Sequence, residues 1–132
     1  RSIIPSIIAG LEDSPAEDVR LSNIHISVPI SVNADSLKTY PAVIPENIKG
    51  YAENRITFGL KLPASAFYVK HIKKLIINDL SVTYKYPDAR PAFYLDDVKD
   101  IRLKSIFIDD KKLLKQETML VEKKSERVEV ID

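Results

Sequence analysis

The chain has 132 residues, of which 45% are hydrophobic and 30% charged, so it can bury the core of one domain and is not disordered by composition. Its 20 basic and 19 acidic side chains are mixed along the sequence, which leaves a net charge of +1 and no basic field for a nucleic-acid backbone. Cysteine is absent, which excludes disulfides, thiolate metal sites and thiol catalysis, and no apolar run approaches the roughly 20 residues that span a bilayer. We therefore expect neither a nucleic-acid partner nor a membrane span.

The beginning of the chain is typical of the interior of a longer protein. It starts at Arg1 without a methionine and enters an apolar stretch at residues 3–9 almost at once. The order of charged, apolar and small-residue regions that marks a signal peptide is absent. We expect further residues before this segment.

From Val19 onward the sequence repeats one apolar skeleton. Seven positions recur with the residue number raised by 26: Phe67, Val69, Ile72, Leu75, Ile77, Leu80 and Val82 return as Phe93, Leu95, Val98, Ile101, Leu103, Ile106 and Ile108. An earlier copy begins at Val19, and its shift to the next copy is 56. A later copy continues with Met119 and Val121 at a shift of 26 and with Val128 and Val130 at 27. Such constancy indicates about four copies of one structural unit.

Within each unit the apolar residues alternate in short runs, such as Phe93-x-Leu95, that are separated by charged residues. These runs predict short strands with one buried face, and the polar breaks predict corners. Three strands per turn, with no stretch long enough for a helix, predict an all-β fold, a parallel β-solenoid of about four turns. The main rival is a leucine-rich repeat, which needs Asn or Cys where this chain has Ile24, Leu80 and Ile106.

Equivalent positions of a solenoid stack about 4.8 Å apart, so outward residues form columns. Lys70, Asp96 and Glu122 are expected to form one column, with a favourable contact followed by a repulsive one. A second column is expected at a corner, where short polar side chains bond neighbouring backbone: Asn23, Asp79 and Ser105.

A long insertion, residues 28–65, interrupts the repeat and contains four prolines. A loop of this length either has a function, here as one wall of a ligand groove, or covers the sheet. Of the two histidines, His25 is expected to face outward and His71 to lie at a corner with Asp97. Neither has a second ligand at a recognisable metal spacing, so no metal site is predicted.

The chain contains, in this order, SIIAGLEDSPAEDVRLSNIHIS, LPASAFYVKHIKKLIINDLSV and PDARPAFYLDDVKDIRLKSI. These phrases resemble the C-terminal turns of bacterial proteins of glycoside hydrolase family 28, the polygalacturonase and rhamnogalacturonan hydrolase group. The resemblance covers about residues 3–109, and DARPAFYLDDV is its most specific part. It implies a right-handed single-stranded parallel β-helix, inverting hydrolysis of pectin-type polysaccharide, and a secreted or periplasmic location.

The resemblance also implies what the chain lacks. The family's catalytic phrases, Asn-Thr-Asp, Asp-Asp, Gly-His-Gly and Arg-Ile-Lys, lie on upstream turns, and none of the set can be placed here. Asp96 and Asp97 offer an Asp-Asp phrase, but their repeat partners are Lys70 and His71, which is typical of a solvated corner. We therefore predict no catalytic residue and no cofactor in this chain, which would serve the upstream turns as scaffold and groove wall.

Six residues are candidates for contact with sugar. Tyr68 and Tyr94 are outward aromatics on the repeat, although neighbouring tyrosines also stabilise each other across strands. In the insertion, the residues that could reach a uronate are Tyr40, Tyr51, Arg55 and Lys61. The alternative function is a non-catalytic β-solenoid module that binds carbohydrate or another surface.

Overall fold

The computed structural model describes residues 4–46, 58–114 and 119–131. The chain is all-β, as predicted, and its seven strands form one mixed sheet that does not close on itself. The elements in chain order are β1 (Ser6–Ala9), β2 (Ala16–Val28), α1 (Ala34–Leu37), β3 (Phe67–Tyr84), β4 (Phe93–Ile108), β5 (Lys111–Lys112), β6 (Leu120–Lys123) and β7 (Glu126–Ile131). The only helix of the described residues is thus a single turn inside the insertion.

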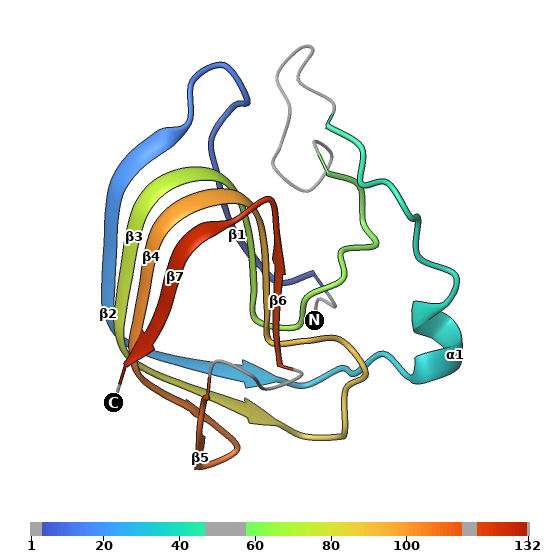
Figure 1. Cartoon of the computed structure of the whole chain (residues 1–132). Coiled ribbons are helices and arrows are strands. Elements are labelled where there is room, and N and C mark those ends of the chain that lie inside the picture. Colours follow the sequence, from blue (N-terminus) through green and yellow to red (C-terminus); the bar gives the residue numbers. More distant parts are fainter. Residues whose placement is uncertain (1–3, 47–57, 115–118, 132) are drawn as a thin grey trace.

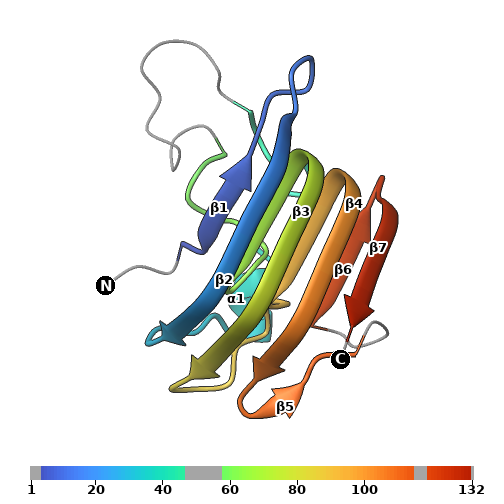
Figure 2. The same cartoon turned by 90° about the vertical axis from the view of Figure 1, so that its left-hand side faces the viewer.

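The strands stack in four layers. β1 and β2 both pair with β3, β3 pairs with β4, and β4 pairs with both β6 and β7, always in parallel. We number the layers from the N-terminus: β1 with β2, then β3, then β4, then β6 with β7. The long strands lie side by side and follow the same curved path (Figures 1 and 2). The short strand β5 turns back antiparallel along the end of β4.

The register between the layers matches the repeat read from the sequence. Phe67 pairs with Phe93, which confirms the shift of 26 between β3 and β4. Val19 pairs with Leu75, and Val128 pairs with Ile101, which confirms the shifts of 56 and 27. Because inward residues meet their own equivalents, each layer extends the same apolar interior.

One predicted register is wrong. Phe93 pairs with Leu120, so β6 continues the stack at a shift of 27 rather than through Met119 at 26. Leu120 is the buried residue here, at 7% exposure. The same displacement places Lys123, and not Glu122, beside Asp96. The predicted column therefore alternates in charge, and the predicted repulsion is absent.

In the two central layers the corners bend the strand without ending it, so β3 and β4 are each one long strand where three short ones were predicted. Each bend is a residue with positive φ at the same place in successive layers: φ is 56°, 57° and 56° at Asn23, Asp79 and Ser105. Asn and Asp tolerate this left-handed conformation better than other side chains that carry a Cβ. Since the first three layers bend at this same position, their hydrogen-bonded pairing continues on both sides of this corner.

Burial of the inward residues depends on the layer. Leu75 in β3 and Leu103 in β4 are 0% exposed, and Val128 in β7 is 3% exposed. The equivalent residues of β2, such as Leu21 and Ile24, are only half-buried. The first layer therefore forms the open edge of the apolar interior.

Candidate functional site

Tyr68 and Tyr94 lie on the outer face of neighbouring layers, with their rings stacked 5.7 Å apart. Tyr68, however, is 0% exposed, because Phe58 and Leu62 of the insertion pack over it. The ring of Tyr68 therefore has a packing role in this structure and presents no exposed face for a sugar to stack on. Tyr94 is half-buried, and the Lys123 ammonium lies 5.6 Å from its ring centroid.

The structure brings together two of the four candidates from the insertion. Tyr40 and Lys61 line one hollow of about 340 Å³ beside α1. Its neighbouring polar groups are already bonded locally: Asn33 Oδ1 accepts a hydrogen bond from the Ser36 amide, and Thr39 Oγ1 donates to the Ser36 carbonyl. The groups of the hollow that a ligand could contact include the Lys61 ammonium and the Tyr40 ring. The other two candidates, Tyr51 and Arg55, lie outside the described residues.

A cluster that the sequence did not predict joins the insertion to a corner of the stack. Glu46 of the insertion contacts both Lys70 and His71 at the first corner of β3. Its Oε1 lies 2.6 Å from His71 Nε2, and its Oε2 lies 3.2 Å from Lys70 Nζ. On the other side, Asp97 Oδ2 lies 2.6 Å from His71 Nδ1, and Asp96 Oδ2 lies 3.5 Å from Lys70 Nζ. Each cation thus lies between a carboxylate of the insertion and one of β4.

The geometry at His71 fits an imidazolium, because both ring nitrogens face carboxylate oxygens at hydrogen-bonding distance and only the charged ring donates from both. Burial alone disfavours that charge, but the hydrogen bonds to Asp97 and Glu46 outweigh it and raise the pKa of His71. The same balance acts on Glu46: burial opposes its charge, while the hydrogen bonds from His71 and Lys70 lower its pKa. The contact is therefore strongest when both groups are ionised.

The geometry of the cluster suits a structural contact between the insertion and β3 better than catalysis. The side chain of His71 is 4% exposed, so a substrate has no access to its nitrogens. The corner position of His71 and its column with Asp97 were predicted, and both are observed. Glu46 was missed because nothing in the local sequence relates it to a corner 25 residues away.

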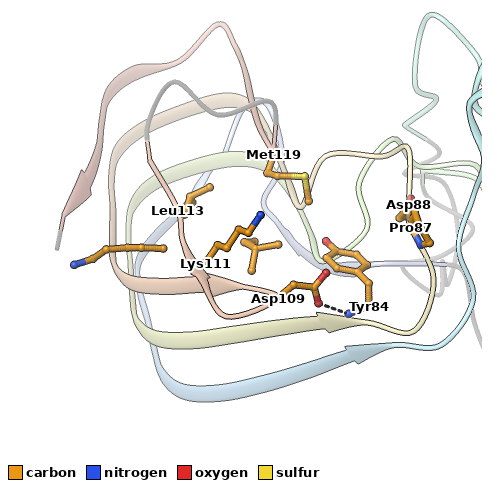
Figure 3. Close-up of a pocket in the computed structure, with 9 residues that line it drawn as sticks. Tyr84, Pro87, Asp88, Asp109, Lys111, Leu113 and Met119 are labelled. Carbon is orange, nitrogen blue, oxygen red and sulfur yellow. Dashed lines mark hydrogen bonds between the residues drawn. The ribbon is translucent and has the colours of Figure 1, made fainter.

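A hollow of about 330 Å³ lies at the C-terminal ends of β3 and β4 (Figure 3). Its apolar lining, including Ile108, Leu113 and Met119, belongs to the main core or packs against it. Two of its polar side chains are engaged, since Asp109 accepts a hydrogen bond from the Tyr84 amide and the Tyr84 hydroxyl lies 2.7 Å from Ser65 Oγ. The hollow is best understood as the end of the core.

The most specific phrase of the sequence resemblance contains a buried ion pair. The guanidinium of Arg90 donates to both carboxylate oxygens of Asp88, at 3.0 and 2.7 Å, and both side chains are 1% exposed. The loop that carries them is bonded to the insertion, because the Ala89 amide donates to the Val32 carbonyl. The DAR part of the phrase is therefore explained by structure and needs no ligand.

Comparison with known proteins finds no matching family model, no matching curated protein and no matching solved structure. Within the described residues, no group of three or more histidine and carboxylate side chains is arranged to hold a metal ion. No helix in this part of the chain is both long and apolar enough to cross a membrane.

Proposed function

We propose that this chain is the C-terminal part of a right-handed parallel β-helix in a pectin-directed glycoside hydrolase similar to family 28. In this proposal the chain completes and stiffens the scaffold and borders the sugar groove, while the catalytic carboxylates lie on layers upstream. The parent enzyme hydrolyses its substrate with inversion and is secreted or periplasmic, as the sequence resemblance implies.

The observation that carries the proposal is the in-register parallel stack. Equivalent inward residues pair across successive layers, as Leu75 does with Ile101. All four layers bend at one shared corner, where φ is positive at Asp18, Lys74, Asp100 and Arg127. Four such layers are the arrangement that a segment of a parallel β-helix requires. The three phrases of the resemblance fall on these layers and on the loops that join them.

The open edge of the first layer supports the proposed partner, which is a further layer of the same protein. Leu21 and Ile24 remain half-buried where the equivalent residues of β3 are fully buried. A parallel strand docked on β2 would cover these side chains and pair the backbone edge that no described strand occupies. Among the predicted contacts, the hollow at Tyr40 and Lys61 is the best candidate for the groove border.

The test compares two polypeptides. One is the natural polypeptide that contains this chain, isolated with an antibody against it and measured as an intact mass, and the other is the 132-residue chain alone. We expect the natural polypeptide to be larger and to hydrolyse oligogalacturonate with inversion, and the 132-residue chain to be inactive. Hydrolysis by the short chain alone, or a natural mass near 14.9 kDa, contradicts the proposal. The second result would favour a non-catalytic carbohydrate-binding module.

A further inference from the structure

A groove of about 530 Å³ crosses the outer face of the stack next to the corner formed by Asp18, Lys74, Asp100 and Arg127, which all have positive φ. Arg20, Lys74, Arg102 and Arg127 line it, and these four cations come one from each layer: β2, β3, β4 and β7. Since adjacent layers are spaced by about 4.8 Å, the cations form a staggered row roughly 14 Å long that runs across the strands. Among the residues that line the groove, the four cations outnumber the two carboxylates, Asp100 and Glu129.

The charges of this row are not all neutralised by the protein. Arg20 pairs with Asp18, and Arg127 forms a two-pronged pair with Asp100, but these pairs are about half-exposed and can exchange partners at little cost. Arg102 and Lys74 are exposed. No described carboxylate lies within ion-pair distance of either, although the charge of Lys74 acts on Asp18 and Asp100 at the same corner. The two central cations of the row are therefore available to an external anion.

One partly exposed apolar side chain lies between these cations, in a lining that is otherwise charged apart from the buried Ile101. It is Ile76, which lies in the outward column between Arg20 and Arg102 and is half-buried. An apolar side chain flanked by cations suits a ring that presents C–H groups on one face and a carboxylate at its edge. A small inorganic anion would contact one or two cations and would not use Ile76.

We infer that this groove binds a linear polyanion with one carboxylate per sugar, a uronate oligosaccharide, laid across the four layers. The inference rests on the proposed function for the choice of uronate. It adds a binding site that is lined by none of the four predicted contacts among the described residues: Tyr40, Lys61, Tyr68 and Tyr94. Bound here, the polymer would be held along the scaffold, away from the insertion.

The test is calorimetric titration of the 132-residue chain at low ionic strength with oligogalacturonate and with its fully methyl-esterified form. The esterified form has the same backbone without the charge. The variant K74Q/R102Q removes the two unpaired cations. The control K38Q/K104Q removes the same charge from exposed sites that do not line the groove. Far-UV circular dichroism checks that all variants fold alike.

We expect saturable binding of oligogalacturonate, at least tenfold weaker binding of the ester, and at least a tenfold loss of affinity in K74Q/R102Q. The control should stay within twofold of the wild type. Oligogalacturonate binding that K74Q/R102Q leaves unchanged overturns the inference and leaves the proposed function standing. A third titrant, dextran sulfate, distinguishes failure of the inference from failure of the proposed function. If dextran sulfate binds while oligogalacturonate does not, and K74Q/R102Q abolishes this binding, the groove binds a polyanion that is not a uronate. The pectin-directed function then loses its support as well. Binding of none of the three overturns the inference.

Discussion

The outer face of β3 has opposite surroundings at two places on the same strand. At Tyr68 the insertion returns over the strand, and Phe58 and Leu62 leave the ring 0% exposed. Further along the strand, Ile76 also points outward, but it stays half-exposed in a groove beside Lys74. Both side chains point outward, but Phe58 and Leu62 of the insertion cover Tyr68, and neither lines the groove at Ile76. Alternation in a stacked sheet thus predicts where a side chain points and not whether solvent reaches it.

The largest effect is expected from removing the covered ring. Tyr68→Ala should lower the free energy of unfolding by about 3–5 kcal/mol, because it leaves a cavity under the insertion. Ile76→Ala on the open face should cost about 1 kcal/mol, since much of its surface is already in water. Urea denaturation followed by circular dichroism measures both. Equal losses would show that the insertion does not cover Tyr68 in solution.

The buried ion pair of Asp88 with Arg90 should stabilise the side of the stack that the insertion covers, in addition to its apolar contacts. Asp88→Asn removes the carboxylate that pairs with buried Arg90, and it should cost about 3–5 kcal/mol because a buried guanidinium loses its counter-charge. Asp35→Asn is the control, since the pair of Asp35 with Lys38 is exposed and should contribute less than about 1 kcal/mol. A loss as small as that of the control would mean that the Asp88 pair adds little.

The third prediction uses pH to loosen the contact of Glu46 with the corner. The pKa of His71 is raised from its ordinary value of 6.5, so the contribution of His71 is complete below that pH and is lost as pH rises through the raised value. The pKa of Glu46 is lowered from 4.5, so its contribution is complete above that pH and is lost as pH falls through the lowered value. Both groups contribute fully between about pH 4.5 and 6.5.

The measurement is urea unfolding between pH 4 and 9 on the wild type and on His71→Gln. Wild-type stability should fall as pH rises above 6.5, and the variant should lack this fall because it has no proton to lose there. Near pH 6 the variant should be less stable by about 1.5–3 kcal/mol, the usual contribution of hydrogen bonds to charged groups. His25 is present in both proteins and cancels in the difference. Parallel curves would contradict the proposed ionised contact.

The smallest effect has the opposite sign. The Tyr68 hydroxyl is buried and makes no hydrogen bond to the described residues. Tyr68→Phe should therefore stabilise the protein by about 1 kcal/mol, because an unsatisfied buried hydroxyl is removed while the ring remains. Tyr94→Phe is the matched control on the half-buried neighbour. Destabilisation by Tyr68→Phe would show that the hydroxyl has a partner after all.

Local pattern was enough to predict the layers and their pairing. Apolar alternation and a constant shift identified the inward residues of β3 and β4, and they pair as expected. The corner at Asn23, Asp79 and Ser105 was also predicted, because short polar residues favour the required backbone. The register of β6 was not, since Met119 and Leu120 are both apolar and alternation cannot choose between them.

The surroundings of the outer face could not be read from the sequence. Tyr68 points outward by alternation, but its burial depends on where Phe58 and Leu62 of the insertion return. Glu46 is likewise placed by tertiary structure and not by any spacing. The outer groove could not be predicted either. In the sequence its cations are mixed with acidic residues, and only the stacking of the layers places them in one row.

The constant register between β3 and β4 gives the stack a repeat of fixed length. Residues 67–92 contain one strand and the loop that leads to the next, and every pair of equivalent residues keeps the same separation along the chain. A second copy of these residues, inserted before Phe93, would place the same inward side chains between two layers that already accept them. Each added copy would lengthen the stack by about 4.8 Å, so length could be set in equal steps by duplication alone.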